Sequence, residues 1–198
     1  SEISCQALLI ATGVSYRRLD TPGIESLTGA GVYYGAAATE AMSCKDQDTY
    51  IVGAGNSAGQ AAMYLSRFAR TVTLIVRGES LAKTMSQYLI DQLAKTPNIA
   101  VQFRSRVTEA QGNGKLDALT IVNDQSGETR TVPAIALFIF IGAMPHTSPI
   151  ADLIECDERG FILSGPDLIA NGRRPRNWPL QRDPYLLETN VPGIFVAG

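Results

Sequence analysis

Residues 49–77 constrain the fold of this chain more than any other part of the sequence. A short apolar run at residues 50–52 is typical of a buried strand, and it leads directly into a glycine-rich segment, residues 53–58. Small and apolar residues then recur at helical spacing as far as Ala69. A second apolar run, residues 72–76, follows. We therefore predict a strand-helix-strand unit of a parallel α/β sheet.

The glycine-rich segment reads G-x-G-x-x-A, a variant of the dinucleotide-binding fingerprint. We expect Gly53 to permit the tight turn after the strand, Gly55 to let the backbone approach a pyrophosphate, and Ala58 to pack helix against strand. The N-terminus of the helix offers free N–H groups and partial positive charge to an anion. The predicted cofactor-binding residues of this segment are Gly53, Ala54, Gly55, Asn56, Ser57 and Ala58. The alternative is a glycine-rich turn that binds nothing.

The residue after the second strand indicates which nucleotide is bound. Units that bind NAD usually carry an acidic residue there, about 20 residues after the motif, whereas units that bind NADP carry an arginine near the 2′-phosphate. This position is Arg77, so we predict NADPH. Glu79 lies two residues further on and would weaken that preference. The alternative is that Arg77 is only a solvated residue at the strand end.

Composition excludes several classes of partner. The chain has 198 residues, 45% of them hydrophobic, and a net charge of −2, which favours neither nucleic acid nor an anionic membrane. It contains no apolar run of membrane-spanning length and no signal peptide at its start, so we expect a cytoplasmic protein. Cys5, Cys44 and Cys156 are widely separated and are predicted to be free thiols, neither a disulfide framework nor a metal site.

Further elements extend the α/β pattern on both sides of the central unit. We predict an apolar, buried strand before Gly13, a second helix carrying Leu81, Met85 and Leu93, and a third strand at residues 99–103. We expect residues 118–122 and 129–132 to form a β-hairpin or a small meander, and residues 134–141 to form the last buried parallel strand. The predicted fold is a doubly wound, Rossmann-like three-layer α/β domain with a small antiparallel β insert.

A series of short motifs along the chain resembles thioredoxin reductase of the low-molecular-weight type, a flavoprotein with separate FAD and NADPH domains. The motifs are, in order, ALLIATG, PGI, GVYYGAAATEA, VGAGNSA, FIFIGAMPHT and VPGIFVAG. The resemblance implies that residues 1–26 end one part of an FAD domain, that residues 27–146 form the NADPH-binding domain, and that residues 147–198 return to the FAD domain. It also implies that the chain is a fragment lacking the rest of the FAD domain.

The chain differs from this family at the positions of the family's two redox-active cysteines. The family carries C-A-T-C after a G-V-x-Y sequence, and here Gly35 and Ala38 occupy the two cysteine positions. Neither residue can attack a disulfide, so no catalytic residue is predicted. Cys44 has no partner at the spacing of a redox motif. The variant resembles a subgroup of reductase-like proteins, some of which are fused to sensory or response-regulator domains.

Two further segments are interpreted from the family pattern and from composition. Gly142 lies in a turn that resembles the family's I-G-x-x-P-N-T segment, and we expect it near the nicotinamide end of the site. His146 in the same turn is assigned a turn or interface role. The tail carries four arginines around Trp178; a contact with another domain or a second copy is favoured over RNA binding.

Three functions follow from these expectations. In the first, the intact protein passes hydride from NADPH to FAD and then to an acceptor other than a disulfide, whereas the isolated chain is inactive. In the second, a redox-inactive module binds NADPH and reports its presence to a fused or partner domain. In the third, the nucleotide site is vestigial and the segment serves dimer packing; the expected assembly is a homodimer.

Overall fold

The computed structural model describes residues 4–35 and 39–197. The chain divides into two compact units. The larger unit is Tyr16–Gly142, and the smaller unit combines Ser1–Ser15 with Ala143–Gly198. The larger unit thus begins before residue 27, because Ile24 and Leu27 are buried in its core and Ala110 N donates to Pro22 O at 2.9 Å. The assignment of these units to NADPH and FAD stays a prediction.

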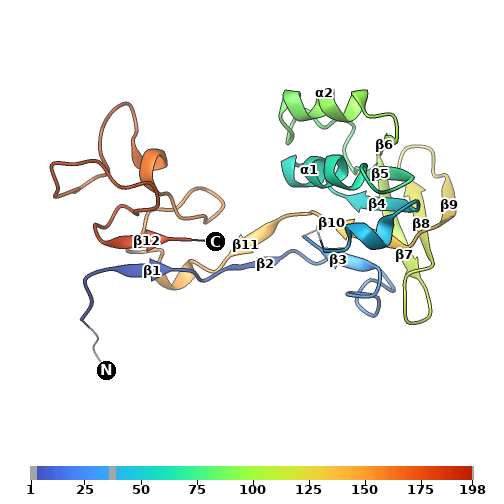
Figure 1. Ribbon diagram of the computed structural model, residues 1–198, viewed down its shortest axis with the longest axis horizontal. Helices are drawn as coiled ribbons and strands as arrows, with labels where there is room; N and C mark the ends of the chain where they lie inside the picture. The colour runs from blue at the N-terminus through green and yellow to red at the C-terminus, as the bar shows by residue number, and fades with distance from the viewer. Residues whose placement is uncertain (1–3, 36–38, 198) are drawn as a thin grey trace. The chain divides into compact units, whose positions relative to one another are not determined.

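A five-stranded parallel sheet forms the centre of the larger unit (Figure 1). The strands lie in the order β3, β10, β4, β5, β6, and every neighbouring pair is parallel. Their bounds are β3 (Val32–Tyr34), β10 (Ala136–Ile139), β4 (Asp48–Val52), β5 (Thr71–Ile75) and β6 (Ile99–Gln102). The predicted parallel α/β sheet is therefore confirmed.

Each face of this sheet is covered by a different kind of layer. Helices α1 (Asn56–Leu65) and α2 (Gln87–Lys95) pack on one face, where Ile51 and Leu74 belong to the same buried cluster. An antiparallel sheet of β7 (Ser105–Gln111), β8 (Ala118–Asn123) and β9 (Thr129–Pro133) packs on the other face, where Val52 and Ile75 are buried. The predicted three-layer α/β fold with an antiparallel insert is confirmed.

Two details of this unit differ from the sequence-based expectation. The second helix begins only at Gln87, although Leu81 and Met85 before it are buried in the same core. The spacing of Leu81 and Met85 therefore indicates that both side chains face the core, and not that the backbone there is helical. The insert also contains a third strand, β7, whose buried Val107 alternates with polar residues, so that its apolar signal is too weak to predict a strand.

The smaller unit contains little regular structure. Strand β1 (Leu8–Ile10) pairs in parallel with β12 (Ile194–Val196), and β2 (Val14–Tyr16) pairs with β11 (Ala143–Pro145). Short 3₁₀ turns lie at Ser148–Ile150 and Gly165–Leu168, and a third, Ala41–Cys44, lies in the larger unit. The prediction of a buried first strand is wrong, since Leu8 and Leu9 are 48% and 60% exposed. A sheet of two strands has too few neighbours to cover both faces of β1.

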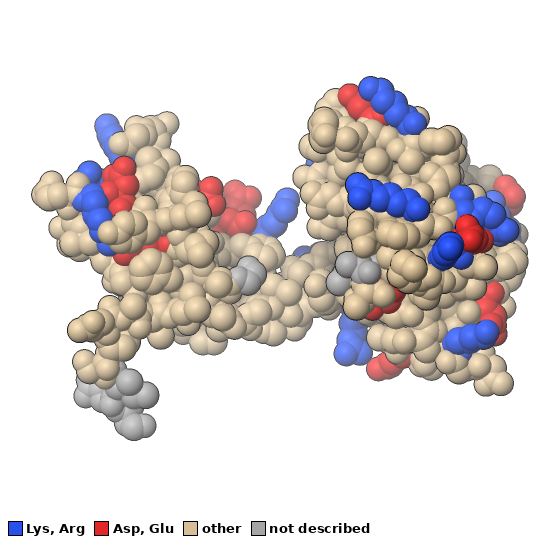
Figure 2. All heavy atoms as spheres, viewed as in Figure 1, with Lys and Arg blue, Asp and Glu red and all other residues tan. Residues whose placement is uncertain are grey.

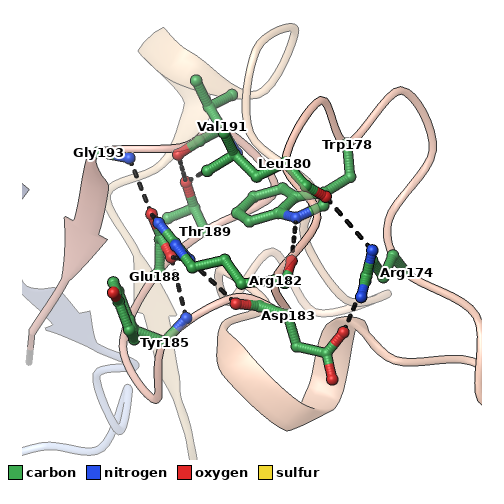
Figure 3. A network of polar contacts seen from close by, with 10 residues as sticks. All are labelled: Arg174, Trp178, Leu180, Arg182, Asp183, Tyr185, Glu188, Thr189, Val191 and Gly193. Carbon is green, nitrogen blue, oxygen red and sulfur yellow. Dashed lines mark hydrogen bonds and ion pairs between the residues drawn. The ribbon is translucent and has the colours of Figure 1, made fainter.

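A buried carboxylate organises the tail of the smaller unit (Figure 3). Glu188 is fully buried and accepts two hydrogen bonds from the Arg182 guanidinium, at 2.6 and 2.9 Å. It also accepts the backbone N–H groups of Tyr185 and Gly193. The guanidinium of Arg182 lies over the Tyr185 ring, 3.9 Å from its centroid, and Trp178 Nε1 donates to Arg182 O. The guanidinium of Arg182 is therefore bound by residues of the same unit. The basic composition of the tail does not predict these contacts.

The three cysteines are free, as predicted, with Cys5 exposed and Cys44 buried. Among residues 4–35 and 39–197, no helix is both long and apolar enough to span a membrane.

Candidate nucleotide site

The parallel sheet brings the predicted site residues to one edge. Gly53 follows β4, Arg77 follows β5, Gly142 follows β10, and Gly35 follows β3. Because neighbouring strands are parallel, all four positions lie at the carboxyl ends of strands. From β4 the chain proceeds to β5 and β6 on one side, whereas β10 and β3 lie on the other side. The edge beside β4 and β10 is therefore the topological switch point at which open α/β sheets bind ligands.

Gly53 and Ala58 form the tight junction between strand and helix. Gly53 has φ +152°, and a methyl group in place of its hydrogen would lie 2.6 Å from Phe140 O and 3.0 Å from Ala58 Cβ. The Gly53 N–H donates to Ile75 O at 3.3 Å. Only glycine fits this position, and only a small residue fits at Ala58, which is completely buried.

Gly55 is a glycine for a different reason. Its backbone, with φ −91° and ψ 177°, is accessible to any residue, and a methyl group added there would have Thr84 O at 3.8 Å as its nearest described neighbour. Packing within the chain thus leaves room above Gly55. The space fits a group that approaches the backbone closely, as a pyrophosphate does in this fingerprint.

Gly55 is also the N-cap residue of α1. Its carbonyl accepts the Gly59 N–H at 3.1 Å, and within the described ranges no side chain caps this end of the helix. The N–H groups of the first turn have no intrahelical acceptor. Together with the helix dipole they provide donors and partial positive charge for an anion above Gly55.

The loop that precedes α2 is hydrogen-bonded to this turn. Thr84 Oγ1 donates to Ala54 O at 2.7 Å, and the Ser86 N–H donates to Asn56 Oδ1 at 2.8 Å. In α1, a methyl group at Gly59 would lie 2.6 Å from Leu89 Cδ2, so the glycine permits close packing of α1 on α2. In the sequence, the contact between α1 and α2 is indicated only by Gly59, a glycine inside a predicted helix.

Arg77 directly follows the buried Val76 and is exposed. No ion pair involves Arg77 within residues 4–35 and 39–197. Glu79, by contrast, is paired with Arg104, whose Nη2 lies 2.9 Å from Glu79 Oε2. Arg104 was absent from the predicted site, because it follows β6 and lies 25 residues further along the chain. The guanidinium of Arg77 is therefore available to a ligand, whereas the carboxylate of Glu79 is already paired with Arg104.

Gly35, at the first of the two cysteine positions, lies beneath a tyrosine. Gly35 has φ +82°, and a methyl group there would lie 2.7 Å from the Tyr16 hydroxyl oxygen. Ala38, at the second position, is outside the described residues. Cys44 is buried in the core beside the helices, and burial raises the pKa of its thiol. A buried thiol of raised pKa is a poor nucleophile.

The turn after β10 has two distinct parts. Gly142 has φ +108°, and its carbonyl accepts the Arg17 N–H at 2.9 Å. His146 lies in the smaller unit, where its Nδ1 is 3.1 Å from Thr12 O and its Nε2 is 2.6 Å from Ser15 Oγ. Because a carbonyl only accepts, Nδ1 donates to Thr12 O, and in this tautomer of the neutral ring Nε2 accepts the Ser15 hydroxyl. These contacts agree with the turn role expected for His146.

Comparisons with known proteins agree with the fold. The family model described as pyridine nucleotide-disulphide oxidoreductase matches residues 1–198. A thioredoxin reductase of Streptomyces clavuligerus is 31% identical over 194 residues, covering 98% of this chain and 53% of that protein. A thioredoxin reductase of Listeria monocytogenes is likewise 31% identical, with 54% of its length covered.

Solved structures give the same result. The thioredoxin reductase of Streptococcus pyogenes superposes with a TM-score of 0.75 at 31% identity, and that of Giardia duodenalis with 0.77 at 30% identity. Each match covers 97% of this chain and 56% of the other. The chain thus spans about half the length of the relatives it matches, and the predicted resemblance to thioredoxin reductases is confirmed. Since the family model extends over all 198 residues, the chain belongs to the pyridine nucleotide-disulphide oxidoreductase family.

Proposed function

We propose that the unit Tyr16–Gly142 binds NADPH and that the intact protein uses it to reduce FAD. The single observation that carries this proposal is the room above Gly55, where an added methyl group would meet only Thr84 O at 3.8 Å, at an N-terminus of α1 that no described side chain caps. NADPH supplies a hydride and FAD accepts it when both are bound, so the task of the chain is to hold and orient them.

The residues of this chain have separate roles in the proposal. Backbone N–H groups of the turn from Gly55 to Ala58 hold the diphosphate, and Arg77 holds the 2′-phosphate. Gly53 and Ala54 shape the turn, and the side chain of Asn56 is directed to Ser86 rather than to the ligand. Gly142 lies beside the nicotinamide end of the site. Family membership supports the pair of cofactors.

We further propose that electrons leave to an acceptor other than a disulfide of this unit. Gly35 carries no thiol, and the space above it is taken by the Tyr16 phenol. The relatives named above are thioredoxin reductases, but the activity of this protein need not be theirs. In the same proposal the protein is cytoplasmic and forms a homodimer.

The second candidate function is a redox-inactive module that senses NADPH for a fused or partner domain. It is favoured by the same observation, the glycine beneath Tyr16 in place of a reactive cysteine. The sensor requires binding with little turnover, whereas the enzyme requires reduction of flavin by NADPH in the intact protein.

Calorimetric titration of this chain with NADPH and, separately, with NADH tests the proposal. We expect NADPH to bind at micromolar to submillimolar concentration and NADH to bind more weakly. Gly55→Glu places bulk and negative charge above the turn and should abolish binding of both nucleotides without unfolding the chain. Absence of heat with either nucleotide in a folded sample would reject the site. Stopped-flow flavin reduction in the intact protein then separates enzyme from sensor.

A further inference from the structure

Glu79 occupies a position that would ordinarily favour NADH. It lies two residues after Arg77, beyond the carboxyl end of β5, where an acidic side chain can accept hydrogen bonds from ribose hydroxyls. A carboxylate there also repels the 2′-phosphate that distinguishes NADPH from NADH. Its exposed carboxylate nevertheless forms an ion pair with Arg104, whose Nη2 lies 2.9 Å from Glu79 Oε2.

The backbone around Arg104 holds its side chain at this place. Arg104 has φ +51°, an uncommon conformation for a residue other than glycine. Its N–H donates to Gly78 O at 2.9 Å, and its carbonyl accepts the Asp124 N–H at 2.7 Å. Gly78 is the residue directly before Glu79, so the backbone bond and the ion pair join the same two segments. The pair is therefore better fixed than two long side chains meeting on an open surface.

We propose that Arg104 determines the preference for NADPH over NADH by neutralising Glu79. The inference rests on the proposed nucleotide site and adds to it a residue that need not touch the nucleotide. With the pair intact, Arg77, Glu79 and Arg104 together carry one net positive charge beside the 2′-phosphate. Without Arg104, the charges of Arg77 and Glu79 cancel, and the carboxylate becomes free to accept hydrogen bonds from a ribose.

The chain offers a matched control for this proposal. Arg106 lies two residues further on, in β7, and its Nε is 2.7 Å from Asp124 Oδ1. The side chains of Arg104 and Arg106 are 42% and 51% exposed. Arg104→Ala and Arg106→Ala therefore each remove one positive charge and one surface ion pair from the same short stretch. Only the first frees an acid beside Arg77.

The experiment is calorimetric titration of the chain and its variants with NADPH and NADH at low salt. Arg104→Ala should lower the ratio of NADPH to NADH affinity by about two- to fivefold, the range of a surface ion pair. Arg104→Lys should retain most of the ratio, and Arg106→Ala should leave it unchanged. Raising the salt to about 0.5 M should shrink the difference between Arg104→Ala and the parent chain, because it is electrostatic.

The double variant Glu79→Gln/Arg104→Ala separates an indirect role from a direct one. If Arg104 acts mainly through Glu79, removing Arg104 in the Glu79→Gln background lowers the ratio much less than it does in the parent chain. An equal loss in that background would make Arg104 a direct ligand of the phosphate and overturn the inference. An equal change in Arg104→Ala and Arg106→Ala would overturn it as well. If the parent chain shows no NADPH preference, the assignment of Arg77 fails first, and this outcome is visible before any variant is made.

Discussion

The side-chain oxygen of Asn56 accepts the backbone N–H of Ser86 at 2.8 Å and so joins the first turn of α1 to the N-cap residue of α2. Thr84 adds a second bond, from its hydroxyl to Ala54 O at 2.7 Å. These bonds connect the loop that follows Arg77 to the glycine-rich turn. The proposed contacts to the diphosphate and to the 2′-phosphate therefore lie on segments that are held together before any ligand arrives. Such preorganisation reduces the entropy lost on binding.

Replacing Thr84 with valine should weaken nucleotide binding without removing any proposed ligand contact. The variant keeps the shape of the side chain but loses the bond to Ala54 O. We expect Kd for NADPH to rise by about two- to tenfold, since a hydrogen bond of this kind contributes about 1 kcal/mol. Calorimetry measures the change. Thr96→Val, which loses a comparable bond to Gln92 O at the far end of α2, serves as the control and should leave Kd unchanged.

Substitution of the two fingerprint glycines should have different effects, on stability at Gly53 and on nucleotide binding at Gly55. Gly53→Ala forces a methyl group to within 2.6 Å of Phe140 O on a backbone that side chains rarely adopt. We expect it to lower the free energy of unfolding by about 2–4 kcal/mol. Gly55→Ala has room for its methyl group, so the melting temperature should be nearly unchanged while NADPH affinity falls. Thermal denaturation and titration of the two variants check this separation, and a large loss of stability in Gly55→Ala would contradict it.

Glu188→Gln should destabilise the smaller unit. The substitution leaves Arg182 without its counter-charge, although an amide can still accept some of the four hydrogen bonds. We expect a loss of about 2–3 kcal/mol, measured by chemical denaturation. Glu158→Gln removes an exposed carboxylate of the same unit and should be close to neutral.

Lowering the pH should destabilise the chain by protonating the Glu188 carboxylate. Hydrogen bonds from Arg182, and then from backbone N–H groups of Gly193 and Tyr185, lower the pKa of Glu188 from 4.5 to about 2. Because the pKa is lower in the folded chain, the contribution of Glu188 to stability is complete above pH 4.5 and is lost as the pH falls towards 2. Denaturation measured from pH 5 to 2 should show a smaller decline in Glu188→Gln than in the parent chain. Parallel declines would show that other carboxylates govern acid unfolding.

The thiols should differ in reactivity. Cys5 is exposed, whereas burial raises the pKa of both Cys44 and Cys156. In the native chain at pH 8, we expect an aromatic disulfide reagent to modify Cys5 first and Cys44 only after unfolding. Cys5→Ser should remove the fast phase. Rapid modification of Cys44 in the folded chain would contradict its burial.

Much of the larger unit was predictable because its signals are local. A glycine turn between two apolar runs identifies β4, α1 and β5 without knowledge of anything else in the fold. The prediction of a buried first strand failed because burial of Leu8 and Leu9 depends on neighbours that the apolar run does not specify. Thr84, Arg104 and Tyr16 could not be assigned, since each acts on a residue 19 or more positions away through contacts that only the folded chain creates.

The position of β10 between β3 and β4 has a consequence for how the chain acquires this fold. Strand β3 pairs with β10 in the central sheet, and more than a hundred residues separate Tyr34 from Ala136. During synthesis β4, α1 and β5 can assemble early, but β3 must wait for β10, roughly 5–20 s at ribosomal speed. Until then, the edge of β4 that later receives β10 lies open to other strands. A nascent chain stalled before Ala136 should therefore be prone to aggregation, and chaperones that bind extended apolar segments would protect it during that interval.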